Sequence, residues 1–142
     1  MSERRFWEAQ LKPLLNRPPS RMARKLQDRF VAGLPDVAYC VEGCAGWIEQ
    51  KWLDRWPARE GTLVDVGLTA MQARWIEAWR AADGWAHVLL CVGSTQEWFL
   101  YNDADDVGPG KRSREALERR AAARGALGDL APLLKALRDR PT

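Results

Sequence analysis

Cysteine and histidine are scarce in this sequence, and a long apolar run is missing. The 142 residues include three cysteines, Cys40, Cys44 and Cys91, without a CxxC pair, and a single histidine, His87. So few thiols and imidazoles argue against a disulfide framework and a zinc site, and they suit a reducing cytoplasm. The longest apolar stretch, around WAHVLLCVG, is too short to span a bilayer, and the charged start MSERRFWEAQ lacks the apolar region of a signal peptide. We therefore expect a cytoplasmic protein with no membrane partner.

Basic residues gather in two segments that flank a centre which is on balance acidic. The net charge is only +3, but between Lys12 and Arg29 six basic residues face the single acid Asp28. From Lys111 onward, nine basic residues face four acids. This distribution favours binding of a polyanion, although solvated helix faces are the simpler alternative for either segment alone. The basic candidates for contact with nucleic acid are Arg17, Arg21, Arg24, Lys25, Arg29, Arg55, Lys111 and Arg112.

Hydrophobic periodicity predicts two main helices. The first runs from the N-cap Ser2 to about Asn16 and is kinked or restarted at Pro13. The second begins after the N-cap Thr69 and stops at Gly84. Its apolar stripe is expected to include Met71, Trp75 and Trp79.

Strands and a helical tail complete the predicted fold. Strands are expected in residues 25–41, interrupted at 33–35, then in 45–52, 85–93 and 96–102, with a short extended piece at 62–67. After a linker at 105–111, two short helices close the chain. The order αβββαββ with a helical C-terminal tail predicts an α/β (α+β) domain with a mixed central sheet flanked by helices. We expect residues 1–107 to form the core and residues 108–142 to form a basic helical extension, within the same domain or used for dimer or DNA contact.

Three charges interrupt the apolar segment GLPDVAYCVEGCAGWIEQKW at residues 33–52. A two-residue turn at Glu42 and Gly43 would place Asp36 directly opposite Glu49, whereas a four-residue loop would place Asp36 opposite Lys51. Because side chains alternate along a strand, both registers put Asp36, Glu49 and Lys51 on one face.

This arrangement is typical of a site for a hard divalent cation. Two carboxylates held close together repel unless positive charge lies between them, and Mg²⁺ combines one or two carboxylates with waters and phosphate oxygens. The neighbouring lysine would hold or polarise an attacking water. The alternative is a salt-bridge cluster on a solvated face. The apolar residues around the hairpin, among them Val37, Tyr39 and Ile48, favour a partly buried site instead.

The segments Gly33-Leu34-Pro35-Asp36 and Trp47-Ile48-Glu49-Gln50-Lys51 resemble the signature of the PD-(D/E)XK nuclease superfamily. Within it, the chain resembles the small phage and bacterial enzymes of the VRR-NUC and Holliday-junction-resolvase-like type. The resemblance covers roughly residues 5–101 and includes a helix carrying Glu8, a helix carrying Gln72 and the strand AHVLLCV. It implies a restriction-endonuclease-like core in residues 1–107.

The resemblance also implies roles for individual residues. Asp36, Glu49 and the main-chain carbonyl of Gln50 would bind Mg²⁺ or Mn²⁺. Lys51 would position the attacking water, and Gln72 would lie at the rim near the water or the scissile phosphate. Glu8 would complete the outer shell or hold a second metal, although an ion pair with Lys12 is an equal alternative.

The tryptophans divide into two groups. Trp52 and Trp56, in the polar loop after the signature, are candidates for stacking on an unpaired base. The residues expected in the core are Trp47, Trp75, Trp79 and Trp98.

Two functions remain open from the sequence. The first is a metal-dependent DNA endonuclease, selective for branched or distorted DNA and working as a homodimer in the cytoplasm, the host's if the chain is phage-encoded. The second is a non-catalytic nucleic-acid-binding or assembly module with the same fold. Joint presence of Asp36, Glu49 and Lys51 favours the enzyme.

Overall fold

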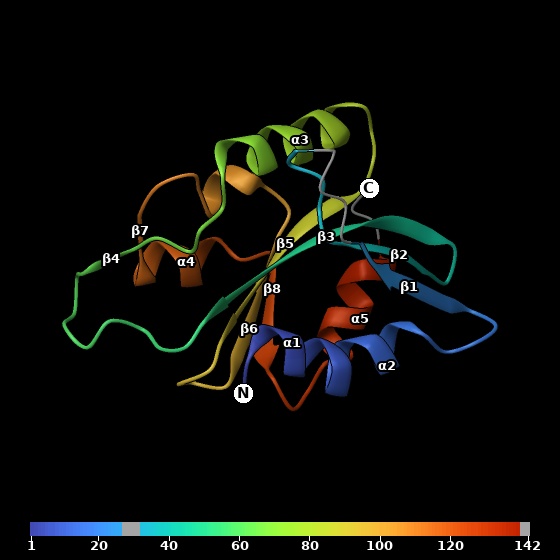
Figure 1. Cartoon of the computed structure of the whole chain (residues 1–142), viewed down its shortest axis with the longest axis horizontal. Helices are drawn as coiled ribbons and strands as arrows, with labels where there is room; N and C mark the ends of the chain where they lie inside the picture. Colours follow the sequence, from blue (N-terminus) through green and yellow to red (C-terminus); the bar gives the residue numbers. More distant parts are fainter. Residues whose placement is uncertain (27–31, 140–142) are drawn as a thin grey trace.

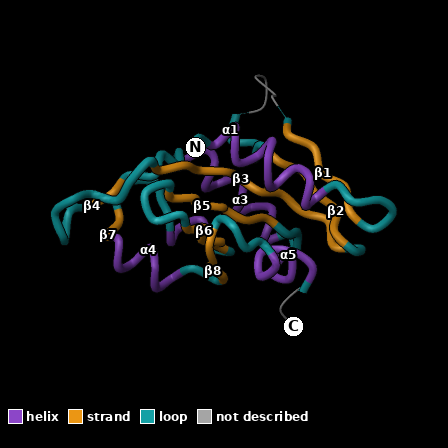
Figure 2. The backbone as a smooth tube through the Cα atoms, turned by 90° about the horizontal axis from the view of Figure 1, so that it is seen from below, coloured by secondary structure: helices purple, strands orange, loops and turns teal. Residues whose placement is uncertain are grey.

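A mixed sheet forms the centre of the molecule. The computed structural model describes residues 1–26 and 32–139. Within them the strands of the main sheet lie in the order β1-β2-β3-β5-β6-β8, and only the β3–β5 pair is parallel. These strands are β1 (Arg21–Lys25), β2 (Val37–Val41), β3 (Cys44–Leu53), β5 (Ala86–Val92), β6 (Glu97–Tyr101) and β8 (Ala123–Ala126). A separate small sheet pairs β4 (Leu63–Val64) with β7 (Arg112–Ser113), at the opposite end of the molecule from β1 and β2 (Figures 1 and 2).

Helices cover both faces of this sheet. One face carries α3 (Ala70–Ala81) and α4 (Arg114–Arg120), near the short 3-10 turn η2 (Ala104–Asp106). The other face carries α1 (Glu3–Phe6), the π-helical turn η1 (Trp7–Leu11), α2 (Lys12–Leu15) and α5 (Ala131–Arg138), as Figure 1 shows. The predicted α/β architecture, a mixed central sheet flanked by helices, is confirmed.

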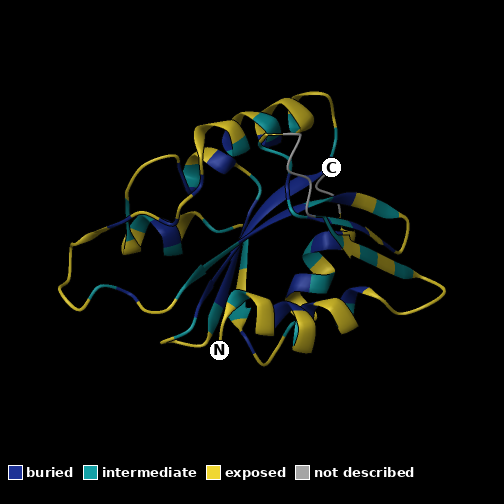
Figure 3. Cartoon of the chain, viewed as in Figure 1, coloured by how far each residue is buried: buried dark blue, intermediate teal, exposed yellow. Residues whose placement is uncertain are grey.

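Strand β5 divides the core into two clusters. All of its residues are buried, which makes it the dark central strand of Figure 3. Because side chains alternate along a strand, Val88 and Leu90 pack toward α3, whereas Leu89 and Cys91 pack toward α1, α2 and α5. A continuous apolar run is typical of a strand that is covered on both faces.

The first helical segment runs from Glu3 to Leu15 with Ser2 as its N-cap, in agreement with the predicted helix from the Ser2 cap to about Asn16. The Ser2 hydroxyl accepts a hydrogen bond from the Arg5 N–H, and the turn before Pro13 widens so that the Lys12 N–H bonds to the Trp7 carbonyl. Proline lacks an N–H and its ring clashes with the carbonyl four residues back, so a π turn just ahead of it accommodates Pro13 without ending the helix.

The first strand region differs from the prediction. In place of one interrupted strand over 25–41, the chain forms β1 from Arg21 and, after the undescribed residues 27–31, the antiparallel β2. Strand β1 starts early because Arg17 and Arg21 exchange backbone hydrogen bonds across the turn between them.

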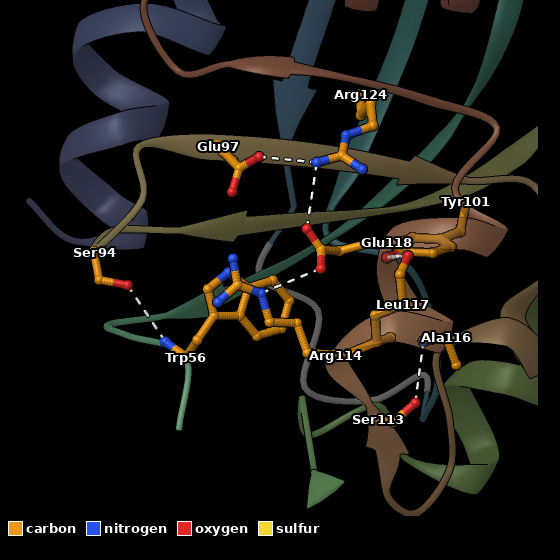
Figure 4. Close-up of polar contacts among 10 residues, drawn as sticks. All are labelled: Trp56, Ser94, Glu97, Tyr101, Ser113, Arg114, Ala116, Leu117, Glu118 and Arg124. Carbon is orange, nitrogen blue, oxygen red and sulfur yellow. Dashed lines mark hydrogen bonds and ion pairs between the residues drawn. The ribbon is translucent and has the colours of Figure 1, made fainter. Parts of the chain in front are cut away.

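The helical C-terminal tail also contains strands that periodicity did not predict. Strand β8 adds to the edge of β6, and β7 pairs with β4. Arg124 of β8 binds Glu97 at 3.0 Å and Glu118 at 3.4 Å, while the Arg114 guanidinium lies 5.0 Å from the centre of the Trp56 ring (Figure 4). The division into a core of 1–107 and an extension stays a prediction, but these contacts join the tail to the sheet.

Several tryptophans lie elsewhere than predicted. Helix α3 buries Ala73 and Ile76, so the predicted stripe of Met71, Trp75 and Trp79 is wrong: Met71 and Trp79 are exposed. The Trp75 and Trp79 rings stack at 5.0 Å, and the ring of Trp47 on β3 meets their edges. Trp47 and Trp75 are partly buried against the core, so these two predicted core residues lie at its margin. Trp98 is buried, as predicted.

Two further tryptophans were expected in a polar loop. Trp56 is instead buried, with its ring against Phe99, because the loop folds back onto the sheet. Trp52 belongs to β3, where its half-buried ring packs near Phe6 on the face opposite Glu49.

None of the helices in residues 1–26 and 32–139 has the length and apolar character needed to cross a bilayer.

His87 is buried between two polar partners. Its Nδ1 lies 2.8 Å from Asn102 Oδ1 and its Nε2 lies 3.1 Å from the Tyr39 hydroxyl, so a neutral ring with the proton on Nδ1 satisfies both. Burial lowers the pKa of His87 to about 3, against an ordinary value of 6.5. His87 is therefore a buried structural histidine with both ring nitrogens satisfied.

We predict an acid-sensitivity that depends on His87. The His87 ring takes up a proton near pH 6.5 in the unfolded chain but stays neutral in the folded chain. The free energy of unfolding should therefore fall by about 1.4 kcal/mol for each pH unit below 6.5. Urea unfolding at about pH 7 and about pH 5 measures this effect in wild type and in His87→Gln. The amount by which the free energy of unfolding of wild type exceeds that of His87→Gln should shrink or change sign at the lower pH. Parallel losses in the two proteins would contradict it.

Candidate active site

The register of the β2–β3 hairpin brings the predicted acids together. Glu42 and Gly43 have φ angles of 49° and 85°, and Val41 pairs with Cys44. This is the predicted two-residue turn, and the four-residue alternative is wrong. Since Val37 pairs with Ile48, the next step along the hairpin places Asp36 against Glu49.

Asp36 lies just before β2, and its side chain accepts a hydrogen bond from β3 in place of a main-chain carbonyl. Its main-chain carbonyl accepts from the Leu26 N–H at 2.7 Å, and its Oδ1 accepts from the Gln50 N–H at 3.0 Å. Because the N–H and C=O of one strand residue point to the same neighbour, the Gln50 carbonyl also faces the Asp36 side of β3. The predicted carbonyl ligand is therefore directed toward the two carboxylates.

Glu49 is held by two donors. Its Oε2 lies 3.3 Å from Lys51 Nζ and 3.3 Å from the Gln72 amide nitrogen. The Glu49 side chain is 6% exposed and that of Lys51 15%, so the pair is not a solvated surface cluster. The structure thus brings together Asp36, Glu49, Lys51 and Gln72.

Helix α3 is docked onto this carboxylate through its first turn. The Thr69 hydroxyl accepts from the Gln72 N–H, while Gln72 Oε1 accepts from the Thr69 N–H at 3.0 Å, forming a capping box. The same Gln72 amide then donates its other end to Glu49. One side chain therefore fixes both the helix start and the carboxylate.

Gly33 lets the loop before Asp36 cross the start of α3. Its φ is +83°, and a β carbon there would lie 2.5 Å from the Met71 carbonyl oxygen. Only glycine fits such a close approach of two backbones in the left-handed region. The signature Gly33-Leu34-Pro35-Asp36 thus has a steric basis.

Burial makes both carboxyl groups harder to ionise. Burial raises the pKa of Asp36 to about 6, opposed by its hydrogen bond from Gln50 and by the charges of Lys25 and Lys51. Burial, followed by the negative charge of Asp36, raises the pKa of Glu49 to about 7, opposed by Lys51. Because ionising both carboxyl groups is unfavourable here, a cation bound between them would be favoured.

The donor set fits a hard divalent cation. Two carboxylates and a main-chain carbonyl are oxygen ligands of the kind that Mg²⁺ and Mn²⁺ accept, with waters or phosphate oxygens completing the shell. No group of three or more histidine, cysteine, aspartate or glutamate side chains with metal-binding geometry occurs in the described part of the chain. A site of this type leaves coordination positions for substrate.

Glu3 is an acid near the site that sequence reasoning missed. Its negative charge contributes to the raised pKa of both Asp36 and Glu49. Glu8, the predicted residue of the same helix, is exposed and pairs with Lys12 at 3.7 Å. The Ser2 cap could have pointed to Glu3, because it places Glu3 in the first helical turn. A metal-shell role for Glu8 stays a prediction.

The predicted DNA-binding residues are scattered over the molecule. Arg17 and Arg24 are exposed, whereas Lys25 is half-buried at the Asp36 end of β1. Arg55 and Lys111 are exposed, but Arg112 donates to the carbonyls of Asp105, Pro109 and Lys111 and so holds its own loop. The Arg21 Nε is buried, and Arg29 lies outside the described residues.

We predict that Glu49→Gln stabilises the metal-free protein above pH 7. With a raised folded pKa, ionised Glu49 costs stability progressively as pH rises from 4.5 to 7, so the amide should gain about 1–3 kcal/mol at alkaline pH and little in acid. Urea unfolding in a chelator measures it. Excess Mg²⁺ should stabilise wild type more than the variant. The same change in the free energy of unfolding for Glu49→Gln and for the exposed control Glu77→Gln would contradict this.

We also predict that Gly33→Ala disturbs the site beyond simple backbone strain. Gly61 also has positive φ, at +82°, but a β carbon there meets nothing within 4 Å. Gly61→Ala should cost about 1 kcal/mol, whereas Gly33→Ala should cost more and weaken Mg²⁺ stabilisation, because it displaces the loop that carries Asp36. Thermal unfolding with and without Mg²⁺ compares the two, and equal effects would argue against this account of Gly33.

No protein-family model and no curated protein matches the sequence. Among solved structures, the chain is similar to Archaeoglobus fulgidus Hjc, a Holliday junction resolvase from an archaeal hyperthermophile. That similarity has a TM-score of 0.47 with 13% sequence identity, and it covers 78% of this chain and 88% of that chain. At this level of similarity, function has to be inferred from the site's own residues.

Proposed function

We propose that the protein is a divalent-metal-dependent endonuclease that hydrolyses phosphodiester bonds in DNA. The observation that carries this proposal is the convergence of the half-buried Asp36 and the buried Glu49, with Lys51 beside them. A salt-bridge cluster would need only one carboxylate for the lysine. The second carboxylate and the Gln50 carbonyl add the oxygen donors that a cation requires.

Each residue has a chemical role in this proposal. Asp36, Glu49 and the Gln50 carbonyl would hold Mg²⁺ or Mn²⁺, which supplies positive charge against the charge that develops on the phosphoryl oxygens. Lys51 Nζ orients the attacking water and donates to a phosphoryl oxygen in the transition state. Gln72 holds Glu49 in place, and its position at the start of α3 puts it at the rim of the site.

The finer assignment rests on the sequence resemblance to the PD-(D/E)XK superfamily. We propose selectivity for branched or junction DNA, as in enzymes of the VRR-NUC and Holliday-junction-resolvase-like type. A homodimer would present two active sites to two strands. The protein would then act in the cytoplasm, the host's if it is phage-encoded.

The test is cleavage of a labelled four-way junction and of linear duplex with Mg²⁺, Mn²⁺ or chelator. Asp36→Asn and Glu49→Gln should reduce cleavage by about 10³-fold or more, because each removes an anionic ligand. Lys51→Ala should cost about 10²- to 10³-fold, which is the usual effect of losing one transition-state donor. Cutting of the junction in preference to the duplex would support the structure selectivity.

Glu77→Gln serves as the matched control and should cut at the wild-type rate, since Glu77 is exposed on α3. Normal cutting by Glu49→Gln would overturn the site assignment. Tight DNA binding without cleavage under either metal would replace the enzyme by the nucleic-acid-binding module.

A further inference from the structure

A basic groove lies between the N-terminal helix and the edge strand β1. It has a volume of about 700 Å³. Its walls are formed by Arg4, Trp7, Glu8, Lys12 and Asn16 on the helical side and by Met22, Ala23, Arg24 and Lys25 on the strand side. None of the residues given a role in the proposed cleavage reaction lines this groove.

Positive charge dominates the groove. Arg4, Lys12 and Arg24 are exposed, and Lys25 is half-buried. The one acid among the lining residues, Glu8, lies 3.7 Å from Lys12 in an exposed ion pair. Such an exposed pair contributes little to stability, so a phosphate that approaches Lys12 can replace Glu8 as its partner at small cost in free energy.

The walls of the groove are fixed by contacts of their own. Asn16 Oδ1 accepts from the Ala23 N–H at 3.0 Å, and the Asn16 amide donates to the Lys12 carbonyl at 2.9 Å. Lys25 Nζ lies 5.9 Å from the centre of the buried Trp7 ring. The helix and the sheet edge are therefore tied together along the groove, so that its cations are presented on a preformed surface.

One end of the groove adjoins the carboxylate site. Lys25 is the last residue of β1, and the N–H of the next residue, Leu26, bonds to the Asp36 carbonyl at 2.7 Å. The Lys25 charge also acts on the Asp36 carboxylate. A chain of phosphates lying along Arg4, Lys12 and Arg24 would thus arrive at Asp36 by way of Lys25.

We propose that this groove binds the sugar-phosphate backbone of the DNA strand that enters the Asp36–Glu49 site. The proposal rests on the proposed nuclease function and adds the path of the substrate. A nucleic acid fits better than an acidic protein segment, because its phosphates suit a groove with four cations that adjoins a site suited to phosphodiester chemistry. The Trp75–Trp79 stack belongs to α3, on the face of the sheet that carries Glu49, and does not line the groove.

Fluorescence anisotropy in chelator tests the groove without cleavage. The double variant Arg4→Ala/Arg24→Ala should bind a labelled single strand and a labelled four-way junction about 10- to 100-fold more weakly at about 0.1 M salt. Its plot of log Kd against log salt should lose about two units of slope, because two phosphate contacts are removed. Lys25 is left intact because of its proximity to Asp36.

Arg119→Ala/Lys135→Ala is the matched control, since it removes the same charge from exposed positions on α4 and α5. Its Kd should change by less than about threefold. Equal weakening in the two double variants would overturn the groove, and so would wild-type binding of poly-glutamate as tight as that of the oligonucleotide. Wild-type cleavage with Mg²⁺ separates the two proposals: groove-dependent binding without cutting would refute the nuclease alone, and cutting without groove-dependent binding would refute the groove alone.

Discussion

The structure of the site depends on one hydrogen bond, from the Gln50 N–H to Asp36 Oδ1. Strand β2 begins one residue later, so β3 lacks a backbone partner at this point, and the Asp36 side chain takes that place. The register of the hairpin, set by the tight turn at Glu42 and Gly43, brings Asp36 to that position. Because a carboxylate, and not a backbone group, satisfies β3 at this point, the β2–β3 pairing ends in a gap where charged groups can meet.

Joining two buried carboxylates is costly, and the surrounding elements reduce that cost without removing it. Lys51 and Gln72 satisfy one oxygen of Glu49, and Gln50 satisfies one oxygen of Asp36. Burial still raises the pKa of Asp36 to about 6, and burial together with the charge of Asp36 raises that of Glu49 to about 7, because the nearby donors offset these effects only in part. A fold selected for stability alone would replace such a pair, so its presence here favours a ligand that carries positive charge.

Sequence patterns predicted what local rules determine and failed where tertiary packing decides. The caps at Ser2 and Thr69 and the buried strand around Leu89 follow from backbone chemistry and periodicity, and the turn at Glu42 and Gly43 is one of the two that the sequence allowed. The prediction assigned the wrong face of α3 to the core because its tryptophans have the largest apolar area, whereas the structure buries Ala73 and Ile76 against the sheet. Strand β8, with the sequence Ala-Arg-Gly-Ala, has no strand signal of its own and forms through pairing with β6.

The same distinction explains why Asp36, Glu49 and Lys51 were found from sequence and Glu3 was not. The first three are related by hairpin register, which is a local property of one turn. Glu3 acts on the site across the sheet, from a helix whose position depends on packing of residues such as Phe6 and Leu11. The N-terminal helix therefore serves the site in two ways: Glu3 adds negative charge near the carboxylates, and Arg4 and Lys12 line the basic groove that adjoins them. The proposed substrate path and the proposed cation site are coupled through this helix, because both depend on how it packs against β1 and β3.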